Sequence, residues 1–311
     1  MATSAPNAKF RLGVDIGGTK IEVMAIDAEG HERWRRRAAT PRGDYDATLA
    51  GVRALVHAAE AELGGRGTVG VAQPGSISPS TGLVRNGNST WLNGRPLQVD
   101  LQRLLDRPVR TANDANCFAL SEATDGAATG ARCVLGVILG TGVGGGIVVD
   151  GRLLDGRNMI GGEWGHNPLP WQTAAEYPGP PCWCGKIGCI EQFLSGPAFE
   201  ADYARDTGQT LKAPAIVELA ETGNAKARAA LGRYENRLAR ALATMVNVID
   251  PDIIVLGGGM SNVRRLYVNV PVLMPDFIFA DTAAITLVPP KHGDSSGVRG
   301  AAWLWPPETA G

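Results

Sequence analysis

Apolar and polar positions follow the same plan along two separate stretches of the chain. Residues 11–30, RLGVDIGGTKIEVMAIDAEG, contain an apolar run, a turn of small residues at Gly17-Gly18-Thr19 and a second run of alternating character. Two strand-forming runs joined by glycines are typical of a β-hairpin. Residues 133–154, CVLGVILGTGVGGGIVVDGRLL, repeat this plan around Gly140-Thr141-Gly142. The pattern predicts an internally duplicated chain with one hairpin in each half.

Two further segments carry apolar residues at helical spacing. They are TLAGVRALVHAAEAELG, residues 48–64, and ARAALGRYENRLARALATMVNVID, residues 227–250. The second segment runs directly into PDIIVLGGGM, which predicts a buried strand that ends at Gly257-Gly258-Gly259. Helices that alternate with strands in this order predict two α/β halves.

Length and charge narrow the classes of protein. A chain of 311 residues is expected to form about two domains. With 30 basic and 31 acidic side chains, the net charge of −1 offers no electrostatic case for binding nucleic acid. The one basic cluster, residues 33–37, is better explained as a solvated strand face than as a docking patch. The N-terminal MATSAPNAKF lacks the features of a secretory signal, and no run is apolar enough to span a membrane, so a cytoplasmic protein is expected.

Three of the five cysteines fall within CWCGKIGC, residues 182–189. Three thiols cannot all pair within one segment, and so few cysteines in a long chain do not suggest a disulfide scaffold. A tetrahedral zinc needs one more ligand, and His166 lies sixteen residues before Cys182. We therefore expect a zinc site on His166, Cys182, Cys184 and Cys189, the alternative being a loop of inert buried cysteines. Cys117 and Cys133 are expected to act as small core side chains.

The glycine turns suggest a place for phosphate groups. Glycines at strand ends expose backbone N–H groups that suit phosphate oxygens, and two facing turns can hold one triphosphate. Neither turn fits the dinucleotide or Walker patterns, and a single glycine turn is more often only a hairpin. Two matched turns together with residues 257–259 favour a nucleotide site. Asp15, beside the first turn, would suit Mg²⁺ bound directly or through water.

Five motifs now appear in one order: DIGGTK, LGTGVGGG, EWGH, CWCGKIGCIE and VLGGG. Together they resemble the ROK family of sugar kinases and repressors, within the actin-like ATPase superfamily, from about Phe10 to the end of the chain. The resemblance implies an α/β fold of two RNase H-like domains, as in actin and hexokinase, flanking a cleft. It places the domains at residues 1–117 with 294–311, and at residues 118–293.

The resemblance also assigns roles to residues. Asp114, in NDAN, is implied as the catalytic base, although the NDAN pattern alone would favour a helix cap. Lys20 is expected either to contact phosphate or to be an ordinary exposed strand lysine. The implied ATP and Mg²⁺ contacts are Asp15, Gly17, Gly18, Thr19, Lys20, Gly140, Thr141, Gly142, Gly257, Gly258 and Gly259. The implied sugar contacts are Asn88, Asn113, Asp114, Glu163, His166 and Glu191.

The expected activity is an ATP-dependent hexose kinase acting on the terminal primary hydroxyl of fructose or mannose. PGSISPSTGLVRNGNSTWLNG and EWGHNPLPW resemble the fructokinase/mannokinase members of the family. Trp91 either occupies space that an N-acetyl group would need or only anchors its loop. The alternatives are an N-acetylglucosamine kinase, a glucokinase and a sugar sensor without turnover. Only nine residues precede Phe10, so no DNA-binding segment is expected, and a homodimer is implied by the family alone.

Overall fold

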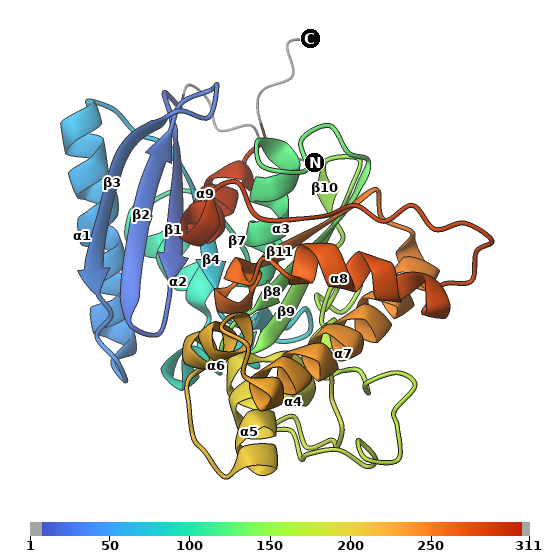
Figure 1. Cartoon of the computed structure of the whole chain (residues 1–311). Helices are drawn as coiled ribbons and strands as arrows, with labels where there is room; N and C mark the ends of the chain where they lie inside the picture. Colours follow the sequence, from blue (N-terminus) through green and yellow to red (C-terminus); the bar gives the residue numbers. More distant parts are fainter. Residues whose placement is uncertain (1–7, 307–311) are drawn as a thin grey trace.

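The structure is a computed structural model that describes residues 8–306, and its strands form two sheets of matching topology (Figure 1). The first sheet has the order β3-β2-β1-β4-β7, and the second has the order β10-β9-β8-β11-β12. In both, an antiparallel hairpin is followed by parallel strands, so the duplication predicted from the sequence is confirmed. The strands are β1 Arg11–Ile16, β2 Lys20–Ile26, β3 Glu32–Ala39, β4 Thr68–Gln73, β7 Val109–Asn113, β8 Cys133–Leu139, β9 Val143–Val149, β10 Arg152–Leu153, β11 Ile253–Gly257 and β12 Leu287–Val288, with a separate pair β5 Ser76–Ile77 and β6 Val84–Arg85.

The helices surround these sheets. They are α1 Tyr45–Leu63, α2 Leu97–Leu105, α3 Asp114–Thr124, α4 Glu191–Leu194, α5 Gly196–Thr207, α6 Ala213–Glu221, α7 Ala225–Ile249, α8 Leu266–Leu273 and α9 Ser296–Trp303. Both helices predicted from spacing are present as α1 and α7, and β11 follows α7 as expected. Helix α1 begins where the Asp44 side chain accepts the Ala47 N–H, and it ends at Gly64 in the left-handed conformation.

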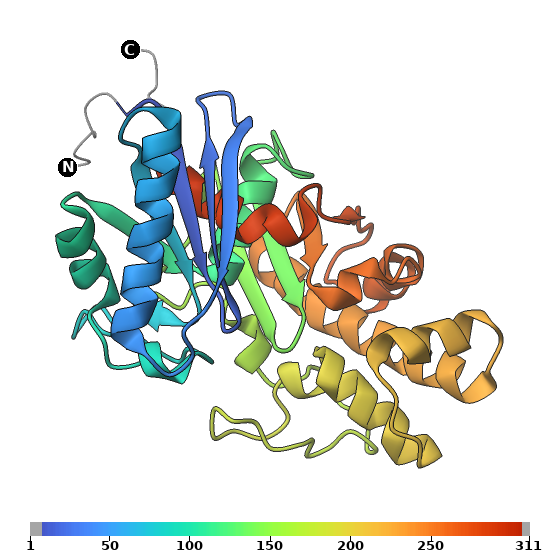
Figure 2. The ribbon, with the colours of Figure 1, turned by 90° about the vertical axis from the view of Figure 1, so that its left-hand side faces the viewer.

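Each sheet has its own hydrophobic core. The first core joins β1, β2 and β4 to α1 and α2, with Val14, Val52 and Leu101 fully buried. The second core joins β8 and β11 to α4–α8, with Leu238 and Leu256 fully buried. Figure 2 shows α1 covering the outer face of the first sheet. Two separate cores allow each half to behave as its own packed unit.

Two helices lie side by side between the sheets. Helix α9 covers the first sheet and α3 covers the second, although α9 comes from the end of the chain (Figure 1). A Cβ on Gly13 of β1 would lie 1.9 Å from the Val298 carbonyl oxygen of α9. A Cβ on Gly136, the matching glycine of β8, would lie 2.6 Å from the Ala119 Cβ of α3. The repeated Leu-Gly-Val motif therefore brings a helix close to each sheet.

The boundaries expected for the two domains fall within this interface. The expected boundary at residue 117 lies inside α3. Helix α9, which was expected to belong to the first domain, packs on the first sheet. Residues 1–7 and 307–311 of the expected first domain lie outside the described residues. The division itself stays a prediction. Within residues 8–306, no helix combines the length and apolar character that crossing a membrane requires.

Candidate active site

The carboxyl ends of three parallel strands meet at one edge of the first sheet. β1 pairs with β4 so that Asp15 lies opposite Ala72, and β4 pairs with β7 so that Gln73 lies opposite Asn113. Asp114 follows directly as the first residue of α3. The structure therefore brings Asp15, Asn113 and Asp114 to the same edge of the sheet.

Asn113 caps helix α3. Its Oδ1 accepts the Ala115 N–H at 2.9 Å, and its Nδ2 donates to the Gly75 carbonyl at 3.1 Å. Asp114 Oδ1 also accepts the Ala115 N–H, at 2.8 Å, while its side chain stays accessible to solvent. Because Asn113 already occupies the capping position, a structural cap does not account for Asp114.

Acidic groups of the two halves influence one another through their charges. Burial raises the pKa of Asp114 to about 6, and the charge of Glu163 adds to the shift. Burial raises the pKa of Asp15 to about 7, with Asp114 and Glu22 contributing, while Lys20 and Arg37 oppose it. The pKa of Glu163 is raised by burial, and Glu191 adds to this while His166 opposes it. A like charge nearby disfavours ionisation of a carboxyl group, so these charges add to the effect of burial on each pKa.

The first glycine turn is fixed mainly by its own strands. Gly17 N–H donates to the Lys20 carbonyl at 3.0 Å, and Thr40 Oγ1 donates to the Gly17 carbonyl at 2.8 Å. Thr19 is exposed at the apex. Lys20, 41% exposed, pairs with the buried Glu22 at 3.3 Å. Lys20 therefore forms an ion pair with Glu22 and also lies beside the turn, so both roles expected for it stay open.

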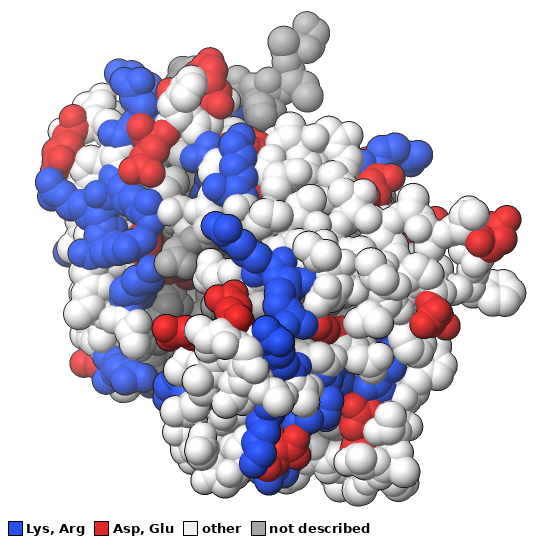
Figure 3. All heavy atoms as spheres, in the orientation of Figure 1, with Lys and Arg blue, Asp and Glu red and all other residues white. Residues whose placement is uncertain are grey.

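A basic surface adjoins this turn on β3. Arg35 and Arg37 both bind the Glu22 carboxylate, with Arg37 Nε 2.8 Å from Glu22 Oε2. Arg36 pairs with Glu62 at 2.7 Å on a neighbouring helix. Figure 3 shows the resulting concentration of Lys and Arg over the β2 and β3 region. The cluster is an exposed, ion-paired strand, as the sequence predicted.

Two polar side chains near this turn escaped the sequence analysis. Ser89 and Gln73 are each 1% exposed, and neither Ser89 Oγ nor Gln73 Oε1 has a hydrogen-bond partner within the described part of the chain. Ser89 Oγ lies 3.6 Å from the position of a Cβ on Gly18. Buried, unpaired polar atoms are rare and often face a ligand or water. In the sequence, the only indication of such a role is that both residues are polar and lie next to segments that carry motifs.

The second glycine turn is held by several other elements. Gly140 N–H donates to the Gly142 carbonyl at 2.9 Å, and Gly196 N–H donates to the Gly140 carbonyl at 2.8 Å. Gly258, at φ 77°, lies so close that a Cβ would come within 2.6 Å of the Leu139 carbonyl. Thr141 is exposed at the apex. The Gly257–Gly259 segment therefore adjoins the second turn, as a shared nucleotide site requires.

Two of the residues expected to bind sugar, Glu163 and Glu191, lie at the starts of short helices, and Glu191 contacts this turn. Glu163 precedes a short 3₁₀ helix, Trp164–His166, and Glu191 opens α4. The Glu191 Oε2 atom accepts the Val143 N–H at 3.0 Å, and its Oε1 accepts the Trp183 indole N–H at 2.8 Å. Glu191 is buried and links the cysteine loop to the second turn.

The loop that contains Asn88 closes on itself beside the first turn. Asn93 Oδ1 accepts the Gly87 N–H, and its Nδ2 donates to the Gly87 carbonyl, both at 2.9 Å. Asn88 is exposed, next to the buried Ser89. Trp91 Nε1 lies 3.3 Å from Thr48 Oγ1 of α1, and its ring packs on the first core. Trp91 therefore anchors its loop, the second of the two roles expected for it.

The four expected metal ligands converge. Their ligand atoms all lie within 4.8 Å of one another, with Cys182 Sγ 3.6 Å from His166 Nδ1 and Cys184 Sγ 3.6 Å from Cys189 Sγ. A tetrahedral zinc with Zn–S bonds of about 2.3 Å separates two sulfurs by roughly 3.8 Å, so the donor set fits zinc. All five cysteines are free; Cys117 is buried and Cys133 is half-buried, so neither belongs to this set.

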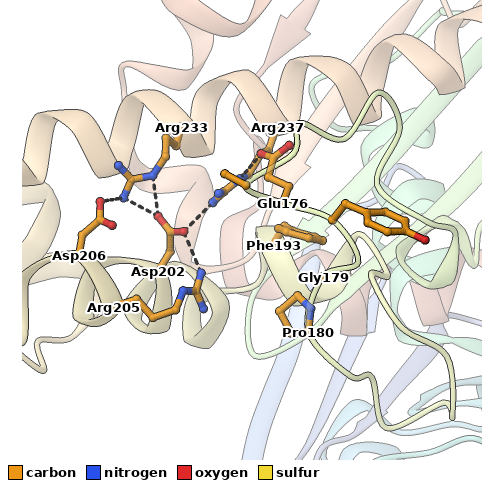
Figure 4. A pocket seen from close by; sticks show the side chains of 11 residues that line it. Glu176, Gly179, Pro180, Phe193, Asp202, Arg205, Asp206, Arg233 and Arg237 are labelled. Atoms are coloured by element: carbon orange, nitrogen blue, oxygen red, sulfur yellow. Dashed lines mark hydrogen bonds and ion pairs between the residues drawn. The ribbon is translucent and has the colours of Figure 1, made fainter.

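A separate cavity of about 400 Å³ lies between α5, α7 and the loop before Cys182. None of the predicted site residues lines it. Figure 4 shows Asp202 of α5 between Arg233 and Arg237 of α7, and Arg237 also binds Glu176 at 2.8 Å. These charges satisfy one another, which favours a structural ion-pair network that holds the loop against the helices.

Two duplicated α/β halves, each with a glycine turn in its hairpin, define a fold of the actin and hexokinase type. The model of the ROK family matches residues 11–308, and the chain belongs to this family. Its solved relatives include the ROK hexokinase from Thermus thermophilus, 29% identical, with a TM-score of 0.84 over 94% of this chain and 96% of that one.

Another solved relative is a ROK glucokinase from Streptomyces griseus in complex with glucose and AMPPNP. It is 27% identical, with a TM-score of 0.75 over 95% of this chain and 98% of that one. Among curated proteins, the N-acetyl-D-glucosamine kinase of Pectobacterium atrosepticum is 42% identical over 94% of this chain and 97% of its own length. The chain is therefore a member of the ROK family, and these relatives of the chain are sugar kinases.

Proposed function

We propose that this chain transfers the γ-phosphoryl group of ATP to the terminal primary hydroxyl of a hexose. The observation that carries the proposal is the position of Asp114, accessible to solvent, with its pKa near 6, at the strand edge shared with Asp15. A carboxylate with a pKa just below neutrality is suited to general base catalysis.

The chemistry assigns each group a task. The sugar oxygen forms a bond to the γ-phosphorus, the bond from that phosphorus to the ADP oxygen breaks, and Asp114 accepts the hydroxyl proton. The backbone N–H groups of the two glycine turns hold the phosphates, and Gly257–Gly259 borders the adenosine. Mg²⁺, when bound near Asp15, would neutralise phosphate charge. Asn113, Glu163, His166 and Glu191 orient the sugar by hydrogen bonds.

Zinc, when bound to His166 and the three cysteines of the loop, would have a structural task. Four protein ligands leave no open position, so the ion would hold the loop rather than activate water. His166 and Cys189 flank the carboxylates of Glu163 and Glu191 in the sequence, so the zinc set would fix both ends of the sugar-binding segment.

N-acetylglucosamine is the substrate that the relatives support best. The N-acetyl-D-glucosamine kinases of Pectobacterium atrosepticum and Escherichia coli are 42% and 41% identical to this chain over 94% of its length. The expected obstacle to an N-acetyl group also weakens, because Trp91 packs on α1 and binds Thr48.

Fructose or mannose is the second candidate. The stretches NGNSTWLNG and EWGHNPLPW resemble the members of the family that phosphorylate these sugars. Both stretches adjoin the site, through Ser89 beside the first turn and through His166 in the ligand cluster. They therefore include residues placed to choose between sugars.

One assay separates these candidates. ADP release is measured with ATP, Mg²⁺ and each of N-acetylglucosamine, fructose, mannose and glucose, and kcat/KM is compared. The proposal expects the highest value for N-acetylglucosamine, whereas a higher value for fructose or mannose selects the second candidate. Sugar binding without any sugar-dependent ADP release would replace the kinase by a sensor.

A further inference from the structure

Trp183 lies in the cysteine loop between two expected metal ligands, yet it is 64% exposed. Its indole N–H does not face solvent, since it donates to Glu191 Oε1 at 2.8 Å. The N–H of this tryptophan is therefore bound, while its apolar ring stays open to contact another molecule.

The same side chain touches a second residue expected to bind sugar. The Trp183 ring meets the His166 ring edge to face, with the ring centroids 5.0 Å apart and an interplanar angle of 87°. Trp183 therefore contacts both His166 and Glu191.

The contact to Glu191 has a consequence for the second glycine turn. The other carboxylate oxygen, Oε2, accepts the Val143 N–H at 3.0 Å, where β9 leaves that turn. With one oxygen bound to the backbone and the other to an indole, the Glu191 carboxylate is fixed in orientation. Glu191 is 8% exposed, so the loss of one donor would leave a buried charge less well satisfied.

We propose that Trp183 is a positioning residue for Glu191 and that its open face forms one apolar wall of the sugar site. This inference rests on the proposed sugar kinase function. The indole N–H sets the direction in which Glu191 presents its remaining lone pairs to sugar hydroxyls. The ring face packs against the C–H groups of the sugar.

Two substitutions of Trp183 separate the role of its N–H donor from the role of its ring. Trp183→Phe keeps an aromatic wall and removes the N–H donor, whereas Trp183→Ala removes both. Ile187→Ala is the matched control, because Ile187 is an apolar side chain of the same loop that is 59% exposed. Bound metal, sugar affinity by calorimetry without ATP, and KM for sugar and for ATP are measured for each.

The Phe variant is expected to weaken sugar binding about tenfold, a shift of about 1.4 kcal/mol, and the Ala variant more. KM for ATP and the metal content should match the wild type. The proposal is overturned if Trp183→Phe binds sugar within twofold of the wild type, if it loses metal, or if its KM for ATP rises equally. A wild type that neither binds nor phosphorylates any hexose overturns the proposed function itself, and the wild-type arm alone reveals that outcome.

Discussion

The two glycine turns occupy matching places in the two halves, but their surroundings differ. The first is fixed by its own strands and by Thr40, and charged groups lie next to it: Asp15 in β1 and Lys20 in β2. The second has no charged residue within it and is held by Gly196, Gly258 and Glu191, from three separate segments. The two copies of the hairpin therefore differ in their contacts: charged side chains of its own strands flank the first turn, whereas residues of three other segments contact the second.

The largest effect is expected from replacing Asp114, the proposed catalytic base, at the edge of the first sheet. Asp114→Asn should lower kcat by roughly 10²–10⁴-fold, because the sugar hydroxyl loses its proton acceptor. Nucleotide affinity should stay close to that of the wild type, since the turns are untouched. Steady-state kinetics and nucleotide titration measure both, and activity within a few-fold of wild type would remove Asp114 from the mechanism.

In the second half of the chain, Cys184→Ser should abolish metal binding, because one of the four ligands is lost. The melting temperature should fall by on the order of 10 °C, since the metal no longer holds the loop. Cys133→Ser is the matched control, because Cys133 lies outside the ligand cluster. Metal analysis and calorimetry test the pair. An unchanged melting temperature in the Cys184 variant, with no metal in either protein, would contradict a structural zinc.

Gly258→Ala should weaken ATP binding about tenfold. The residue has φ 77°, and a Cβ would approach the Leu139 carbonyl at 2.6 Å, so the second turn must shift. Gly208→Ala is the control, since Gly208 also has a positive φ, 72°, but nothing lies within 4 Å of its Cβ position. Equal nucleotide affinities in the two variants would show that the second turn does not depend on this contact.

The smallest effects concern pH. Because the pKa of Asp114 is about 6, kcat/KM should fall as the pH drops below about 6.

The stability of the metal-free and nucleotide-free protein should show the opposite trend and fall as the pH rises. The folded pKa values of Asp15 and Asp114 lie above the ordinary 3.8. The folded state therefore binds more protons between about pH 4 and 7, and the free energy of unfolding falls as the pH rises through that window.

Denaturant unfolding of the wild type and Asp15→Asn across this window measures the effect. The substitution should flatten the fall in stability, because the amide does not ionise. A decline equally steep in both proteins would show that the buried charge at Asp15 is not its source.

Much of the fold was predictable because its signals are local. The two hairpins, α1, α7 and β11 follow from periodicity and turn residues within single segments. The four expected metal ligands also lie close in sequence, between residues 166 and 189, so spacing alone brought them together.

The rest depends on contacts between distant segments. The packing of α9 against β1 joins residues nearly 300 positions apart, and no local pattern encodes it. For the same reason the sequence could not predict that Trp183 contacts Glu191 and Glu191 contacts Val143. Nor could it predict that the Ser89 hydroxyl beside Gly18 has no hydrogen-bond partner among residues 8–306. Trp91 shows the limit most clearly, since its residue type suited both a pocket wall and a core anchor, and only the contact with Thr48 of α1 distinguishes them.

We infer that these two unlike turns hold ATP while its γ-phosphoryl group is transferred to the primary hydroxyl of a hexose. Phosphorus and proton NMR of a reaction with ATP, Mg²⁺ and N-acetylglucosamine, with fructose in parallel, tests it most directly. We predict one sugar phosphate per ADP, with the phosphorus coupled to the protons of the terminal CH₂ group. Phosphate on the anomeric or a ring hydroxyl, or free phosphate without a sugar phosphate for either sugar, would contradict it.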